Sequence, residues 1–213
     1  MNCFEVGDRP MGNQNKSSTR LRLEIAQIAA KFVAVDGIND YLTAKKKAAR
    51  YLGTNPERNL PTNHEVEQAL IDYQNLFQAA RQKQLLLSMR RKSIKAMRLL
   101  NKFEPRLVGP VLTGTATQYT EITIHLFHDE PEQIGFHLDA YGIPYSCCEK
   151  LIRISLNEKA NLPSYRFVAE NDVIILIIFP ERQKNLIPIS SVSNKPMQRA
   201  SLQQVESLII DPS

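Results

Sequence analysis

The sequence predicts an α+β protein, in which a helical N-terminal region is followed by a mixed β-sheet with flanking helices. Two observations lead to this prediction. Before Pro105, apolar residues recur at intervals of three and four, which is the period of amphipathic helices. After Pro105, short runs rich in Val, Ile and Leu are separated by turn residues, a pattern typical of strands.

Composition limits the class of protein. Of the 213 residues, 43% are hydrophobic and 23% are charged, as in an ordinary folded domain. The longest apolar run, Val173–Phe179, is too short to cross a bilayer, and residues 1–12 lack the apolar core of a secretory signal. The three cysteines do not form a disulfide framework. We therefore expect a cytoplasmic protein with no membrane segment.

Shifts in residue pattern divide the chain into four parts. Residues 1–17 are polar and contain glycine, so we expect a disordered N-terminus there. A helical region over 18–103 and an α/β domain over 104–180 follow. The last part, 181–213, is predicted to be a tail that holds one short helix.

Two helices are predicted in the first half of the helical region. Apolar residues at helical spacing extend over 18–35 and again over 39–52. Each segment is followed by a glycine, Gly37 or Gly53, which is the residue that most often ends a helix.

The third helix has the clearest start in the sequence. Thr62 and Glu65 have the spacing of a capping box, in which each residue binds the backbone N–H of the other. No proline or glycine interrupts residues 62–102. We expect one long helix or two nearly continuous ones there.

The second half of the chain has the pattern of a mixed sheet. A helix is predicted over 130–141, and Ser201 with Gln204 three residues later predicts the start of the tail helix. The last two predicted strands are joined by Glu170-Asn171-Asp172 and should form an antiparallel hairpin. The five predicted strands are 107–112, 121–127, 151–156, 165–169 and 173–179.

Positive charge is concentrated in one segment. From Arg81 to Arg106 there are nine basic side chains and one acid, Glu104, a net charge of +8 in a chain whose total is +5. This segment is either the solvated face of a long helix or a binding surface for phosphate groups. Phe103 is its only aromatic residue, so binding to nucleic acid would be electrostatic and unspecific. The candidate nucleic-acid-binding residues are Arg90, Arg91, Lys92, Lys95 and Arg98.

A second segment contains two glycines followed by a polar start to a strand. Gly109 lies in the first predicted strand, Gly114 follows five residues later, and Thr120 directly precedes the next predicted strand, which begins at Glu121. This segment of about 20 residues resembles the signature of the polymerase-β-type nucleotidyltransferase fold. By spacing, Gly109 and Gly114 match that family's two glycines, Thr120 its hydroxyl residue, and Glu121 and Thr123 the two aspartates of its Asp-x-Asp motif.

The resemblance implies a nucleotide site within residues 104–180. In that family, the glycine turn holds the phosphates of a nucleoside triphosphate, and the two aspartates bind two Mg²⁺ ions with a third carboxylate from a later strand. For this chain it implies nucleotide binding at Gly109, Gly114, Thr115 and Thr120. It also implies that Glu121 is the catalytic residue and a metal ligand.

The sequence departs from the family pattern at the residues that perform the chemistry. Pro110 replaces a serine and has neither a hydroxyl nor an N–H group, and Glu121 is one methylene longer than aspartate. Thr123 is neutral, and Val173–Phe179, where the third carboxylate is expected, contains no acid. One carboxylate of three therefore survives.

His125 could compensate in part for the missing carboxylates. It stands two residues beyond Thr123, so Glu121, Thr123 and His125 should share one face of a strand and could form a single-metal or polar site. The alternative is that His125 is an ordinary half-buried strand residue.

These observations favour a nucleotidyltransferase-like protein with a degenerate metal site, which binds a nucleoside triphosphate with Mg²⁺ and has weak or no transferase activity. The alternative is a non-catalytic scaffold that binds nucleic acid or a protein through the basic helix over 81–106. The apolar stripes of the first helices are either core or a contact surface for a partner or for a second copy of the chain.

Overall fold

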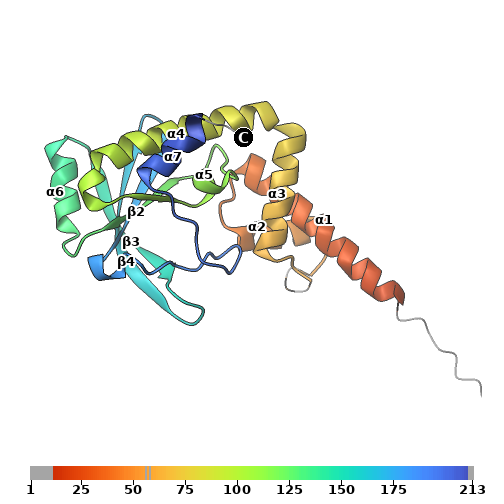
Figure 1. Ribbon diagram of the computed structural model, residues 1–213. Helices are drawn as coiled ribbons and strands as arrows, with labels where there is room; N and C mark the ends of the chain where they lie inside the picture. The colour runs from red at the N-terminus through yellow and green to blue at the C-terminus, as the bar shows by residue number, and fades with distance from the viewer. Residues whose placement is uncertain (1–11, 56, 58, 211–213) are drawn as a thin grey trace, which may run out of the picture. The chain divides into compact units, whose positions relative to one another are not determined.

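The computed structural model describes residues 12–55, 57 and 59–210. It confirms the predicted α+β class, with N-terminal helices followed by a five-stranded mixed sheet and flanking helices (Figure 1). The chain divides into two compact units between Tyr73 and Gln74. Within the described part of the chain, no helix has both the length and the hydropathy required to span a membrane.

Unit 1 is made of α1 (Gly12–Asp36), α2 (Tyr41–Tyr51) and most of α3 (Asn63–Phe77). Helix α1 begins six residues before the expected start at Ser18, and the rest of the predicted disordered N-terminus, residues 1–11, lies outside the described residues. Alanines let the helices approach closely in a core that includes Ile25, Ala29, Ala30, Val33, Ala44, Ala48, Val66 and Leu70.

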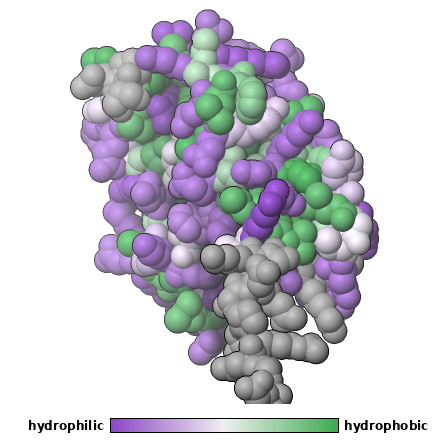
Figure 2. All heavy atoms as spheres, turned by 90° about the vertical axis from the view of Figure 1, so that its right-hand side faces the viewer, coloured by the Kyte–Doolittle hydropathy of each residue, from purple (hydrophilic) through white to green (hydrophobic). Residues whose placement is uncertain are grey.

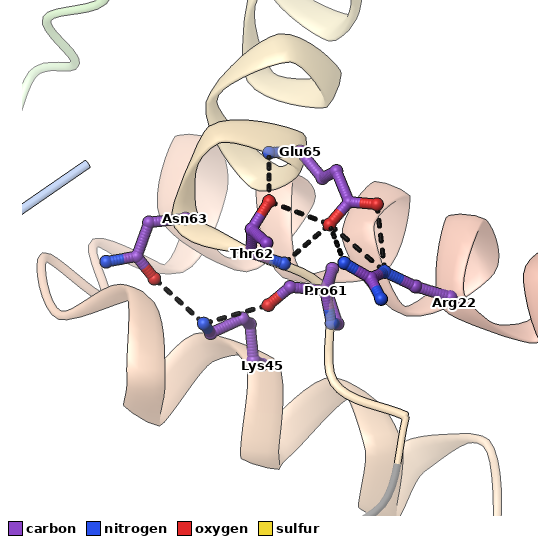
Figure 3. Close-up of polar contacts among 6 residues, drawn as sticks. All are labelled: Arg22, Lys45, Pro61, Thr62, Asn63 and Glu65. Carbon is purple, nitrogen blue, oxygen red and sulfur yellow. Dashed lines mark hydrogen bonds and ion pairs between the residues drawn. The ribbon is translucent and has the colours of Figure 1, made fainter. Parts of the chain in front are cut away.

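The predicted capping box at the start of α3 is confirmed (Figure 3). The backbone N–H of Thr62 donates to Glu65 Oε2 at 2.6 Å, and the N–H of Glu65 donates to Thr62 Oγ1 at 3.2 Å. Arg22 of α1 binds the same carboxylate with two nitrogens, at 2.8 and 2.7 Å. These hydrogen bonds, led by that of Arg22, lower the pKa of Glu65 to about 2. The box therefore ties α1 to α3 as well as capping α3.

A lysine makes the corresponding link from α2. Lys45 is 8% exposed, and its ammonium group donates to the carbonyl oxygen of Pro61 at 2.9 Å and to Asn63 Oδ1 at 2.8 Å (Figure 3). Burial lowers the pKa of Lys45. A buried ammonium needs such oxygen partners, so the segment before α3 is held against α2.

The predicted helix over 62–102 forms as two nearly continuous helices, α3 and α4 (Ala79–Leu99), with Gln78 between them in a non-helical conformation. Helix α4 belongs to unit 2, because its buried residues Met89 and Met97 lie in the core of the sheet. The boundary between the units therefore falls about 30 residues before the predicted one at residue 103.

Unit 2 contains a sheet with strand order β1-β2-β5-β4-β3. Strands β2 and β5 are parallel, and the other neighbouring pairs are antiparallel. The helices that accompany the sheet are α4, α5 (Pro110–Thr113), α6 (Glu132–Ala140) and α7 (Leu202–Ile210), with α7 beside α4 (Figure 1). The strands are β1 (Arg106–Val108), β2 (Ile122–Phe127), β3 (Tyr145–Arg153), β4 (Lys159–Ala169) and β5 (Asp172–Phe179).

Some predicted boundaries were wrong. The first strand ends at Val108, not at residue 112, because Gly109 has a positive φ of 74° and Pro110 begins a short helix. Strands β3 and β4 begin about six residues before their predicted starts at 151 and 165. Most of the added part of β3 is exposed to solvent, so it lacks the apolar pattern by which a strand is predicted, whereas the added part of β4 alternates between exposed and buried residues.

Other predictions were confirmed. β4 and β5 form the antiparallel hairpin, and α6 lies within its predicted range. Helix α7 begins with the expected cap: the N–H of Ser201 donates to Gln204 Oε1 at 2.8 Å, and the N–H of Gln204 donates to Ser201 Oγ at 3.4 Å.

The sheet has two different faces. The inner face packs against α4, α6 and α7 through Ile122, Ile124, Leu126, Ile174, Leu176 and Ile178. We call the opposite side, which carries Thr123 and His125 of β2, the outer face. Part of the outer face has a smaller core that includes Phe127, Ile175, Ile177, Phe179, Leu162 and Ile154. Residues 180–200 lead back to β1, where Ala200 forms a bridge with Leu107.

The surface in the view of Figure 2 is covered mostly by hydrophilic side chains, with hydrophobic ones between them in small groups. Isolated exposed apolar residues, such as Leu23 and Leu151, are normal on a folded protein and do not by themselves indicate a binding surface.

The contact between α6 and the hairpin gives a prediction. A Cβ atom at Gly135 would lie 2.8 Å from the hydroxyl oxygen of Tyr145 and 3.3 Å from that of Tyr165. Because of this overlap, Gly135→Ala should lower the free energy of unfolding by about 1–3 kcal/mol. The higher helix propensity of alanine should offset about 1 kcal/mol of that loss.

The control is the same substitution in a Tyr145→Phe background, which removes the nearer oxygen and its bond to Asp139. Urea unfolding of the four chains of this double-mutant cycle should show a smaller loss, or a gain, for Gly135→Ala in that background. Equal losses in both backgrounds would show that the Tyr145 hydroxyl is not the obstacle.

Candidate functional site

The structure brings the predicted first glycine and the predicted carboxylate to the same end of the sheet. β1 and β2 are antiparallel neighbours, with Val108 opposite Thr123. Gly109 follows Val108 directly, and Glu121 comes directly before β2. The end of one strand and the start of the next therefore form a polar corner, which is the candidate site.

The two glycines of this corner are explained by backbone conformation. Gly109 and Gly114 have φ values of 74° and 95°, which L side chains rarely adopt. Between them, the carbonyl oxygen of Gly109 accepts from the N–H of Leu112 at 3.0 Å, and that of Pro110 accepts from Gly114 at 2.9 Å. A Cβ at either glycine would meet no atom of the described residues within 4 Å. The glycines are required by the turn itself.

The two predicted threonines are engaged within the loop that follows. Thr115 is buried, and its hydroxyl lies 3.3 Å from that of Thr113. Thr120 accepts from the N–H of Thr117 at 2.8 Å through its hydroxyl, and its own N–H donates to the Thr117 carbonyl at 3.0 Å. Both side chains therefore stabilise the loop, and Thr120 closes a turn directly before Glu121.

Glutamines from the helices hold the same loop from outside. Gln82 donates to the carbonyl oxygens of Gly114 and Ala116 at 3.0 and 2.7 Å, and Gln74 donates to that of Ala116 at 3.2 Å. These bonds satisfy carbonyl groups that a loop without regular structure leaves unpaired. The glycine corner is thus fixed in position before any ligand binds.

Glu121 forms an ion pair with Arg166, a residue that was not predicted. Arg166 Nε lies 3.4 Å from Glu121 Oε1, and the two side chains are 46% and 34% exposed. Arg166 of β4 is opposite Ile175 of β5, which is opposite Thr123 of β2, so Arg166 and Thr123 stand in one row across the sheet. Among the described residues, Glu121 is the only polar partner of the guanidinium group.

The expected place of a third carboxylate is apolar. Ile175, the neighbour of Thr123 on β5, is 3% exposed, and Ile177 is 4% exposed. No group of three or more His, Cys, Asp or Glu side chains that could hold a metal ion occurs in the described part of the chain.

His125 shares the outer face with Thr123 but is fully buried. Its Nδ1 accepts from Arg199 Nε at 3.3 Å, and its ring lies 4.7 Å from that of Phe179. Burial first, and the positive charge of Arg199 second, lower the pKa of His125 to about 3. His125 is therefore neutral with the proton on Nε2, for which the described residues provide no partner. His125 therefore fits neither of its two predicted roles, that of a metal ligand and that of an ordinary half-buried strand residue.

These residues do not fit a magnesium site. Mg²⁺ prefers carboxylate and other oxygen ligands in octahedral geometry. Glu121 is the only carboxylate of the set and lies beside the cation of Arg166, Thr123 has no charge, and His125 offers a buried nitrogen. The predicted set of metal ligands, Glu121, Thr123 and His125, therefore lacks the charge and the donor type for this ion.

No local pattern connects Arg166 with Glu121, although the alternation Tyr165-Arg166-Phe167 places the arginine on the opposite face from the two apolar rings. The missing information was the cross-strand register. The same register places Ser146 opposite Arg166, and Cys148 opposite Ser164, on the outer face. The Ser164 hydroxyl donates to the Cys148 carbonyl at 3.0 Å.

The predicted nucleic-acid-binding residues do not form a stripe of unpaired charges. Lys92 binds Asp172 at 2.5 Å and Glu170 at 3.4 Å, and Lys95 binds Glu170 at 3.2 Å. Most of the basic residues in the set thus have structural partners, with Arg98 bound to Glu206 at 2.7 Å and Arg90 donating to the carbonyls of Val111 and Leu112 at 3.2 and 3.3 Å.

These partners explain how the chain accommodates its local surplus of charge. Asp172 raises the pKa of Lys92 through a hydrogen bond, and burial lowers the pKa of Arg90. The fifth residue of the set, Arg91, is exposed. Helix α4 is therefore bound to the hairpin and to α7 by its basic side chains.

Comparisons with models of protein families, with curated proteins and with solved structures found no match to this chain.

The buried histidine predicts a dependence of stability on pH. The unfolded chain protonates His125 below about pH 6.5, whereas the folded chain protonates it only near pH 3. Stability is therefore lost as the pH falls through this window, by about 2 kcal/mol at pH 5 relative to pH 7.5. Native-state hydrogen exchange of the β2 amides should show this loss in the wild-type chain.

His125→Gln, which stays neutral, is the comparison variant and should show a decrease smaller by about that amount. If the two chains lose the same free energy between pH 7.5 and 5, the histidine is not held neutral.

Proposed function

We propose that this protein is a non-catalytic, nucleotidyltransferase-like module that binds a nucleotide at the corner formed by Gly109, Glu121, Thr123 and Arg166. The observation that carries the proposal is the convergence of the glycine turn and Glu121 at one end of β1 and β2. The resemblance of the segment implies this arrangement for a phosphate site. The rigid loop and the half-exposed guanidinium of Arg166 support it further.

The charge of the corner argues against metal-dependent transfer. Two-metal phosphoryl chemistry needs several carboxylates to hold two divalent ions. Here the single carboxylate, Glu121, is paired with Arg166, and the neighbouring position on β5 is Ile175. Nucleotide binding without transfer is the function that remains for such a site.

A nucleic-acid scaffold is less well supported. Four of the five cations of α4 that would bind a nucleic acid, all but the exposed Arg91, contact Asp172, Glu170, Glu206 or backbone carbonyls. Binding of a polyanion would have to break these contacts.

A thermal-shift panel tests the proposal. ATP, GTP, ADP and adenosine would each be added at several millimolar, with Mg²⁺ or with EDTA. A nucleotide that binds the folded chain should raise Tm, because a concentration of ten times Kd adds about 1.4 kcal/mol of stability. Adenosine, which has no phosphate, is the control and should give little or no shift.

Incubation with α-labelled nucleotides completes the test and should give no transfer of label. Absence of any nucleotide shift would contradict the proposed binding. Label transfer that Glu121→Gln abolishes would contradict the loss of catalysis.

A further inference from the structure

We infer that Arg166 takes the part of the metal ions at this site: it binds the phosphates of the ligand directly, in competition with Glu121, and makes recognition independent of Mg²⁺. The inference rests on the proposed function and adds to it the ligand chemistry, which is a nucleoside polyphosphate free of metal. It starts from the misfit between the corner and a magnesium site.

The position of Arg166 is suited to binding a phosphate group. It lies in β4, which is hydrogen-bonded to β5 on one side and to β3 on the other, so its backbone is held firmly. The register puts it in the row of Thr123 and Ser146, and its side chain is 46% exposed. A cation is therefore presented to solvent two strands away from Thr123, the residue that matches the second aspartate of the family motif, with Ile175 between them.

The guanidinium group has binding capacity to spare. Only its Nε contacts Glu121, at 3.4 Å, and within the described residues its two terminal nitrogens have no hydrogen-bond partner. Two parallel N–H groups match the oxygens of a phosphate, whereas a lysine would offer only a point charge. Ser146, the neighbour of Arg166 on β3, has a hydroxyl group that donates to the Arg166 carbonyl oxygen at 3.4 Å.

Glu121 then acts as a competitor of the ligand. A partly exposed ion pair of this length is weak, so a phosphate can displace the carboxylate from Arg166 at small cost. The carboxylate also repels the phosphate. Neutralising Glu121 should therefore tighten binding. In a metal site the sign is opposite, because loss of a carboxylate ligand weakens binding of the metal and its nucleotide.

Titration calorimetry of the full chain with ADP in EDTA and in Mg²⁺ tests this inference. The wild-type chain should bind ADP in EDTA at least as tightly as in Mg²⁺. Glu121→Gln should bind ADP several-fold more tightly, and Arg166→Gln at least tenfold more weakly. Arg166→Lys should recover only part of the affinity, because it keeps the charge but loses the two-pronged contact.

Arg91→Gln is the matched control, because it removes an exposed arginine from α4 and should leave the affinity unchanged. Pyrophosphate and adenosine, titrated separately, show whether the phosphates alone carry the affinity, and pyrophosphate should bind while adenosine should not. Because Arg166→Gln could disturb the sheet, the opposite effect of Glu121→Gln provides an independent test.

The outcomes separate the inference from the proposed function. If ADP binds only with Mg²⁺ and Glu121→Gln weakens binding, Arg166 does not replace the metal, although the corner is still a nucleotide site. If Arg91→Gln lowers the affinity as much as Arg166→Gln does, the ligand is attracted by general charge and the inference is overturned. If no phosphate compound binds in either medium, both the inference and the proposed function fail.

Discussion

The burial of β5 on both faces is the constraint on which unit 2 depends. Ile174 and Leu176 enter the core beneath α4, α6 and α7, while Ile175 and Ile177 are covered on the outer face. The parallel pairing of β5 with β2 joins the two cores. At the buried positions 174–179 of this strand, a carboxylate would be taken out of water, at a cost of several kcal/mol unless a cation pairs with it. The packing that stabilises the sheet therefore disfavours the acid that a two-metal site requires.

Many charged side chains of the protein are joined in ion pairs, which its net charge does not show. The basic surplus of α4 is matched by acids far away in sequence, on the β4–β5 turn and on α7, so that helix and hairpin are held together. The carboxylate of Glu65 has a similar part in unit 1, where it caps α3 and binds Arg22 of α1. At the corner, the ion pair of Glu121 with Arg166 is partly exposed, and we infer that a ligand opens it.

Local patterns predicted most of the fold, because helix periodicity, capping boxes and apolar strands are properties of neighbouring residues. The box of Thr62 and Glu65 and the burial of β5 follow from them. The start of β3 did not, because exposed strands carry no apolar alternation. At the site, the shared face of Thr123 and His125 follows from alternation, whereas the pairing of Arg166 with Glu121 depends on registers between strands some 40 residues apart. The burial of His125 likewise depends on Arg199, which is remote in sequence.

A crystal structure of the chain with ADP, grown without divalent cations, tests the central claim most directly. We expect a phosphate group within hydrogen-bond distance of the guanidinium nitrogens of Arg166, beside the turn at Gly109, and Glu121 turned away from Arg166. A nucleotide bound elsewhere on the molecule, or phosphates at this corner that leave the ion pair intact, would contradict it.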